Sequence, residues 1–249
     1  MRKSILAAIA AASLFAVPAH AADVMLPAVA PVPAPPPPTA APPTVAGYVG
    51  IYGGVLTDFS AAIAAVAADA AIAISRERMD IQLELRDVTY FTGGLTQSLA
   101  AAIVHAYRRN SSAAVGAFGG YEAVIAGGLT NVLQLGAEAA MFRGRATLYA
   151  QLAAVYLFAG GTNAWGAYVR GVTRFFPSDN VRLEAGVRYL YLNSGGPASV
   201  ITPEIEGEFQ LPGRPLSFVA TFRGTFVVGS GTGLYTALAG IRFHFGGRD

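Results

Sequence analysis

Hydrophobic and polar residues alternate along most of the chain beyond Gly47. In the stretch 181–192 the odd positions hold valine, leucine, alanine and tyrosine, whereas Arg182, Glu184 and Arg188 stand at even positions. The same period of two recurs in 201–211, 216–228 and 235–245. This period is typical of β-strands whose two faces meet different surroundings. The pattern therefore predicts an all-β fold.

Clusters of turn-forming residues interrupt the alternation about every 17 residues, which leaves about 13 residues for each strand. Tilted strands of ~9–11 residues already cross a bilayer. Eleven candidate turns predict twelve strands in an antiparallel up-and-down transmembrane β-barrel, with both chain ends on one side. The candidate turns are Thr57–Ser60, Ser75–Met79, Thr92–Thr96, Arg108–Ser112, Gly127–Asn131, Arg143–Arg145, Gly160–Asn163, Pro177–Asn180, Asn193–Pro197, Leu211–Pro215 and Gly229–Gly233.

The turns fall into two alternating classes. Every second turn is polar or carries arginine, as in Arg143–Arg145, whereas the others are rich in glycine, threonine and asparagine, as in Gly229–Gly233. Turns at opposite ends of a barrel would alternate in this way. We expect the arginine-bearing turns to face the periplasm, because the exported N-terminal segment begins there.

One segment leaves the number of strands open. Ala61–Ile74 is rich in alanine, which has the highest helix propensity, and a helix or plug there would leave ten or eight strands. As a strand, the segment would expose Val66 and Ile74 and turn Asp69 inward. The alternation also falters at residues 87–88, which indicates a β-bulge.

The N-terminus has the features of a secretory signal peptide. Arg2 and Lys3 precede an apolar stretch too short to span a bilayer, and small residues up to Ala21 form a cleavage site. Residues 1–21 are therefore interpreted as a signal peptide cleaved after Ala21. Residues 22–46 contain nine prolines and are expected to form an extended, disordered periplasmic leader. Residues 47–249 are assigned to the barrel.

The composition favours a barrel whose outer face meets lipid. The chain is 53% hydrophobic and only 13% charged, yet no long apolar run follows the signal peptide. A soluble barrel hides an apolar interior, whereas a membrane barrel is apolar outside and polar inside. Aromatic residues gather near strand ends, for example Trp165 and Tyr189 at one end and Phe218 and Phe243 at the other, as in interfacial girdles. We expect the protein in the cell outer membrane.

Charged residues on the predicted inward face are the best functional lead. Closing the turn near Gly195 predicts Arg188 opposite Glu204 and Glu184 opposite Glu208, and closing the turn near Gly213 places Arg223 beside Glu204. Glu204 would then lie between two arginines. The candidate lumen residues are Glu84, Arg86, Glu122, Glu138, Arg170, Arg174, Arg182, Glu184, Arg188, Glu204, Glu206, Glu208, Arg223 and Arg242.

Two interpretations of these residues compete. They could line a narrow aqueous pore and set its ion preference, or they could fill the barrel as a salt-bridged network, as side chains do in eight-stranded barrels. Small residues at other inward positions would leave room, which favours the pore. These positions are Gly116, Gly120, Gly136, Ala140, Gly186 and Gly240.

Other chemistry finds little support in the sequence. With no cysteine, and with only His105 and His244 left after the signal peptide, we expect no metal site, no cofactor and no serine–histidine catalytic pair. We interpret His105 as an interfacial residue and His244 as a rim residue. Without Arg2 and Lys3 the basic residues fall from 17 to 15, equal to the 15 acidic ones, so nucleic acid is not an expected partner.

The two ends of the mature chain resemble one known family. Ala22-Asp23 with the proline-rich leader, the stretch GYVGIYGG from Gly47, and the final stretch ALAGIRFHF ending at Phe245 are similar to alphaproteobacterial outer-membrane β-barrel proteins of the porin-like, surface-antigen type. The resemblance implies an outer-membrane barrel. Expected partners are outer-membrane lipid, lipopolysaccharide and the barrel-assembly machinery, and a homo-oligomer is left open.

Taken together, these features predict a small passive diffusion pore for ions or small hydrophilic solutes. The alternative is a closed structural barrel that supports the envelope or presents surface antigens. An enzyme is not expected, because the sequence lacks a paired nucleophile and base.

Overall fold

The structure is a computed structural model that describes residues 44–58, 61–76, 79–92, 95–125, 128–160, 162–193, 196–231 and 233–246. The predicted signal peptide and most of the predicted leader lie outside the described residues. The strands are β1 (Thr44–Thr57), β2 (Ala62–Arg76), β3 (Met79–Thr92), β4 (Leu95–Arg109), β5 (Ala113–Ile125), β6 (Leu129–Arg143), β7 (Ala146–Ala159), β8 (Thr162–Ser178), β9 (Val181–Asn193), β10 (Pro197–Gln210), β11 (Leu216–Val227) and β12 (Gly233–Gly246).

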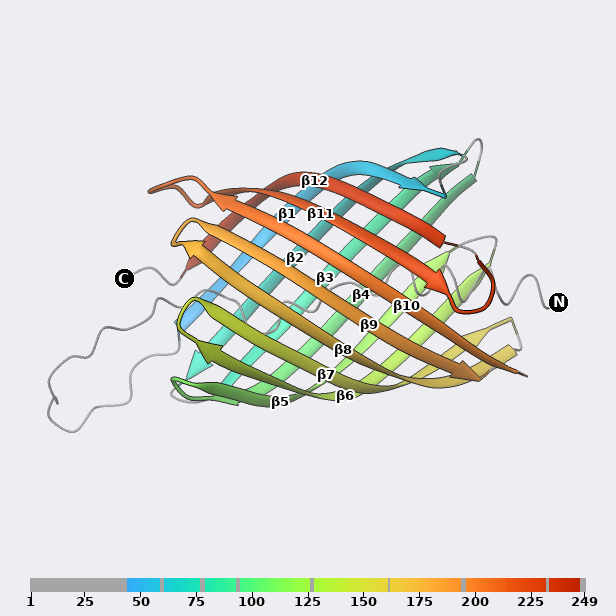
Figure 1. Cartoon of the computed structure of the whole chain (residues 1–249), viewed down its shortest axis with the longest axis horizontal. Helices are drawn as coiled ribbons and strands as arrows, with labels where there is room; N and C mark the ends of the chain where they lie inside the picture. The colour runs from blue at the N-terminus through green and yellow to red at the C-terminus, as the bar shows by residue number, and fades with distance from the viewer. Residues whose placement is uncertain are drawn as a thin grey trace, which may run out of the picture.

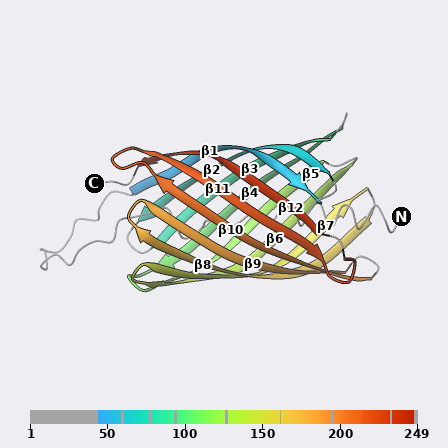
Figure 2. The same cartoon turned by 45° about the horizontal axis from the view of Figure 1, so that its top comes forward.

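The twelve strands form one closed antiparallel barrel in which each strand pairs with its neighbours in the sequence and β1 pairs with β12 (Figures 1 and 2). The β1–β12 seam runs from Ala46 opposite Gly246 to Thr57 opposite Tyr235. The predicted twelve-stranded all-β barrel is thus confirmed. In the part of the chain that the structure describes, no helix is long and apolar enough to cross a membrane.

The alanine-rich segment is strand β2, paired on both sides with β1 and β3. Val66 and Ile74 are exposed on the outside, as the strand alternative required. The predicted bulge at residues 87–88 is wrong, because the β2–β3 register runs through Asp87 and Val88 without a shift. Alternation continues there, with Asp87 outward and Val88 inward. Strand β1 begins at Thr44, three residues before the expected boundary at Gly47.

Side chains separate onto two faces with a period of two along every strand. Large apolar residues are exposed on the outside, such as Ile51, Val115, Leu135 and Leu152. A wide apolar outer face of this kind requires an apolar solvent, which a bilayer provides. Aromatic pairs also lie on this face, for example Trp165 against Tyr191, with ring centroids 6.4 Å apart.

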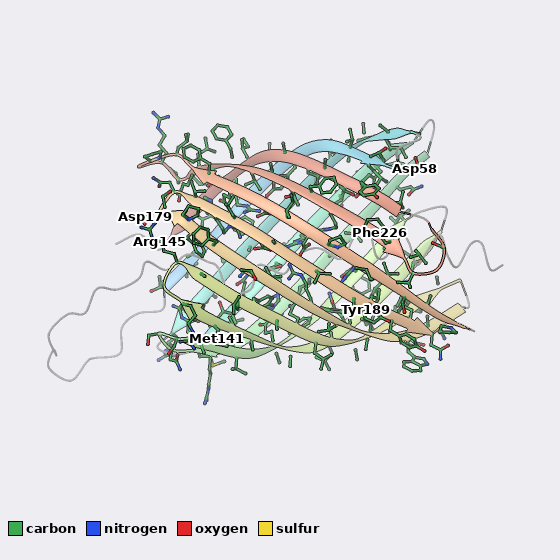
Figure 3. All side chains as sticks on the ribbon, in the orientation of Figure 1. Asp58, Met141, Arg145, Asp179, Tyr189 and Phe226 are labelled. Atoms are coloured by element: carbon green, nitrogen blue, oxygen red, sulfur yellow. The ribbon has the colours of Figure 1, made fainter. Side chains whose placement is uncertain are left out.

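The two classes of turn lie at opposite ends of the barrel. Figure 3 shows Arg145 and Asp179, in the turns after β6 and β8, at the end where β1 begins, whereas Asp58 lies at the other end. We call these ends the terminal end and the far end. Gly144 has a φ of 58°, which suits the two-residue connection between β6 and β7. Which end faces the periplasm stays a prediction.

Candidate functional site in the barrel lumen

The charged residues assigned to the lumen from the sequence all point inward in the structure. Thirteen of the fourteen are buried, and the side chain of Glu208 is only 9% exposed. Each sits on a strand whose next residues face outward, so the alternation alone determines its direction. Buried charges require partners, and the partners decide what the lumen can do.

Glu204 lies between two arginines, as expected, but one of them differs from the prediction. Its Oε1 accepts a hydrogen bond of 2.5 Å from Nη2 of Arg170, and its Oε2 accepts one of 3.3 Å from Nη2 of Arg223. The predicted Arg188–Glu204 and Glu184–Glu208 pairs are wrong. In the β9–β10 register Arg188 is opposite Thr202, and Glu184 is opposite Glu206.

A second group of ion pairs lies nearer the terminal end. Nη2 of Arg182 contacts Glu206 Oε1 at 2.5 Å and Glu208 Oε2 at 2.7 Å. On the neighbouring strand, Nε of Arg174 lies 2.6 Å from Oε2 of Glu184. The acidic residues along β10 are therefore neutralised by arginines from β8, β9, β11 and β12.

Arg242 connects strands on both sides of the seam. Its Nη1 lies 2.8 Å from Glu208 on β10, and its Nη2 lies 3.2 Å from Asp69 on β2. Between them on β1, the Tyr52 hydroxyl accepts a 2.9 Å hydrogen bond from Arg242 and donates one of 2.9 Å to Asp69. The ring of Tyr48 lies 4.3 Å below the guanidinium. The sequence analysis did not identify the two tyrosines, although their inward parity in β1 was a usable signal.

His105 is a lumen residue, so its interpretation as an interfacial histidine is wrong. Its side chain is fully buried, and Nδ1 lies 2.9 Å from Oε2 of Glu138. Glu138 also accepts a 2.6 Å hydrogen bond from the Tyr149 hydroxyl. His244, by contrast, is partly exposed near the terminal rim and contacts Glu208 at 2.9 Å. Within the described residues no group of side chains has the arrangement of a metal site.

The inward glycines leave less room than expected. A Cβ on Gly136 would lie 2.7 Å from the ring of Phe118, and one on Gly240 would lie 2.5 Å from the ring of Tyr52. A Cβ on Gly116 would lie 2.5 Å from the backbone oxygen of Ala106 and from the Cβ of Tyr107. At these positions the missing side chain makes space for atoms of the neighbouring strand, and that space is not open lumen.

The lumen changes character along its length. Toward the far end the inward residues of the described strand ends are apolar, with a few threonines and Gln97, and none carries a charge. We call this zone the apolar collar. Every strand contributes to it, through Leu56, Ala65, Tyr90, Leu99, Val124, Val132, Val155, Leu157, Ala164, Leu190, Leu192, Val200, Val227 and Leu234. The sequence analysis missed the collar because it considered only the charged inward positions.

The ion pairs described above join residues on adjacent strands or on strands two apart. Arg170 on β8 reaches Glu204 on β10, His105 on β4 reaches Glu138 on β6, and Arg242 on β12 reaches Glu208 on β10. Contacts over such short arcs run along the barrel wall. They give the wall a network of polar contacts in the terminal half and the middle of the lumen. An apolar cluster interrupts this network at the terminal end of β4 to β8, and its members are Tyr107, Ala114, Ala140, Tyr149 and Val172.

This architecture is that of a closed, antiparallel, twelve-stranded β-barrel with an apolar outer face and a lumen rich in charged residues. No protein-family model and no curated protein matches the sequence. Among solved structures, the chain is similar to the KdgM porin in complex with disordered oligogalacturonate, with a TM-score of 0.55 and 7% identity over 80% of this chain and 99% of the porin. It is also similar to an outer-membrane channel from Pseudomonas putida F1, with a TM-score of 0.54 and 11% identity over 86% of this chain and all of that channel.

At these identities the likeness concerns the fold. A second structure of the KdgM porin gives a TM-score of 0.51 with 10% identity over 79% of this chain and 99% of the porin. The resemblance of the two chain ends to the alphaproteobacterial family has no sequence match behind it and stays a prediction.

Proposed function

We propose that the protein is an outer-membrane channel through which ions or small hydrophilic solutes diffuse passively. The observation that carries the proposal is the direction of the ion pairs. Arg170–Glu204 and Arg182–Glu208 run along the wall, as expected of residues that line a path. Twelve strands also exceed the eight of barrels that are filled by side chains. The predicted signal peptide and the arginine-bearing turns support an orientation with the terminal end in the periplasm.

One observation favours the alternative of a closed structural barrel. The inward polar side chains are almost all buried, with Arg174 and His105 inaccessible to solvent. In that case the network would act as a filling that stiffens the barrel. The lipid, lipopolysaccharide and assembly-machinery partners expected from the sequence belong equally to both functions, and a homo-oligomer is compatible with both.

Single-channel recording of the refolded mature protein in a planar bilayer separates the two functions. Folding is first verified by heat-modifiable gel migration. A pore gives discrete, reproducible current steps in KCl, whereas a silent membrane with well-folded protein contradicts the proposal and supports the closed barrel.

Ion selectivity tests whether the charged wall lines the path. Glu204→Gln combined with Glu206→Gln and Glu208→Gln removes three carboxylates and leaves their arginine partners in place. We expect the permeability of K⁺ relative to Cl⁻ to fall, measured as a shift of the reversal potential in a KCl gradient. An unchanged reversal potential would mean that these side chains lie outside the permeation path.

A further inference from the structure

The apolar collar and the charged zone lie in series along one lumen, and the border between them has a distinct composition. On β3, β9 and β11 the last charged inward residues before the collar are Arg86, Arg188 and Arg223. On β5 and β10 the corresponding residues are glutamates. Glu122 on β5 experiences the charge of all three arginines, and Glu204 on β10 lies 3.3 Å from Arg223. We call the three arginines the border cluster.

The register places the border cluster directly against apolar residues. Arg86 and Glu122 both lie opposite Ala101 of β4, from its two sides. One step further toward the far end, the inward residues on these three strands are Val88, Leu99 and Val124, which belong to or pack against one apolar cluster. A layer of arginines, in which Arg86 contacts Glu84 and Arg223 contacts Glu204 at 3.3 Å each, is thus followed immediately by an apolar layer.

The same step occurs on the opposite wall. Arg188 lies opposite Thr202, and the next inward pair toward the far end is Leu190 with Val200. The guanidinium of Arg188 lies 5.5 Å from the ring centroid of Tyr168, itself part of the apolar cluster on this side. The transition from charged to apolar is therefore a property of the lumen as a whole.

The free energy of entering this lumen differs between a hydrated ion and an amphipathic molecule. Apolar constrictions oppose the passage of hydrated ions because water leaves them. An apolar body gains free energy in such a zone, at about 0.8 kcal/mol for each buried methylene group. A negatively charged group on the same molecule would meet the guanidinium groups of the border cluster, which are strong partners for carboxylate and sulfonate oxygens.

We infer that the channel selects small amphipathic anions, whose apolar body occupies the collar while the anionic group contacts Arg86, Arg188 and Arg223. The inference rests on the proposed function, because it requires an open path. It narrows the solute class from small hydrophilic solutes in general to organic acids that carry an apolar body. With the orientation proposed above, such an anion entering from outside meets the collar first.

The test compares alkylsulfonates, which stay ionised and do not cross lipid readily. Channels of the mature protein are recorded in KCl while hexanesulfonate, methanesulfonate or hexyltrimethylammonium is added to one side. We expect hexanesulfonate to interrupt the current at a concentration at least about tenfold lower than methanesulfonate, since burial of two methylene groups is already worth about that factor. Hexyltrimethylammonium should interrupt the current only at a higher concentration than hexanesulfonate, because the arginines of the border cluster repel its positive charge.

Substitutions test separately the apolar collar, which would bind the hexyl chain, and the border cluster, which would bind the anionic group. Leu192→Asn should abolish most of the preference for the hexyl chain, whereas Leu192→Val should retain it. Arg188→Gln with Arg223→Gln should remove the discrimination between the anionic and cationic hexyl compounds. Arg143→Gln, at the terminal end of β6, is the matched control. It should change neither the preference for the hexyl chain nor the discrimination between the anionic and cationic compounds. Heat-modifiable migration verifies that each variant folds.

The outcomes separate this inference from the proposed function. If there are no current steps in KCl and hexanesulfonate leaves protein-containing vesicles no faster than protein-free ones, the channel itself is refuted. If KCl steps occur but methanesulfonate or hexyltrimethylammonium acts as strongly as hexanesulfonate, the channel stands and the inferred solute class is wrong. Faster hexanesulfonate efflux without KCl steps would support the inference strongly.

Discussion

Replacing Arg242 by methionine should destabilise the barrel more than any single change at a surface arginine. The side chain contacts Glu208 on β10, Tyr52 on β1 and Asp69 on β2, so it links strands on both sides of the β1–β12 seam. Methionine has a similar length and keeps the apolar contact with the ring of Tyr48. It removes the charge and every hydrogen bond. The variant therefore isolates the polar part of the interaction.

The magnitude follows from the partners that remain. Removing one member of a buried ion pair costs about 3–5 kcal/mol when the other is left alone. Here Glu208 keeps Arg182 at 2.7 Å and His244 at 2.9 Å, and Asp69 keeps the Tyr52 hydroxyl at 2.9 Å. The loss of the cation–π contact with Tyr48 adds about 0.5–2 kcal/mol. We expect a net loss of about 2–4 kcal/mol in the free energy of unfolding.

Urea unfolding in lipid vesicles, followed by gel migration and tryptophan fluorescence, measures this loss. The matched control is Arg143→Met, where the exposed arginine contacts only the sulfur of Met141 among its described hydrogen bonds, and a change below about 0.5 kcal/mol is expected. Asp69→Asn in the Arg242→Met background should cost less than Asp69→Asn alone, because the two residues are coupled. If Arg242→Met were no more destabilising than the control, the seam would not depend on this network.

Three further experiments test other parts of the structure. Leu152→Arg on the exposed face of β7 should lower the stability of the folded barrel in vesicles by about 2–4 kcal/mol, with Leu152→Phe nearly neutral; equal folding of the two variants would argue against a lipid-facing surface. Gly136→Ala should cost about 1–3 kcal/mol in urea unfolding, because its methyl group would lie 2.4 Å from the backbone oxygen of Leu152 and 2.7 Å from the ring of Phe118, whereas Gly119→Ala, facing ordinary contacts at 3.7 Å, should change little. Trp165, the single tryptophan, is exposed on the outer face, and brominated lipids should quench its fluorescence after insertion; unquenched emission would contradict its place in an interfacial girdle.

Strand number and the direction of side chains were accessible from the sequence because both depend on local features. Turn residues such as those at Arg143–Arg145 punctuate the chain, and period-two alternation tells which residues share a face. The segment that forms β2 was ambiguous, since alanine favours helices and the evidence for a strand lies in its two neighbours, β1 and β3. Pairing across the sheet settled what local propensity could not.

The pairing of charged residues was less accessible. The predicted β9–β10 register was off by two residues, a slip that preserves the faces but changes every partner, so Arg188 and Glu184 were placed correctly inside and paired wrongly. Contacts between strands two apart, such as Arg170 with Glu204, depend on the curvature of the closed wall. His105 was misplaced because its proximity to a turn received more weight than its parity along β4.

The pairing of β1 with β12 means that the backbone ring has no edge strand, and the place where the polypeptide starts is not marked in the sheet. Ala46 lies opposite Gly246, so the two ends of the barrel sequence adjoin at the terminal end. A short linker between them, with new termini opened in the exposed Gly144-Arg145 turn at the same end, would leave all twelve strand pairings in place. The order of strands around the wall, more than their order from N- to C-terminus, is what this sequence encodes.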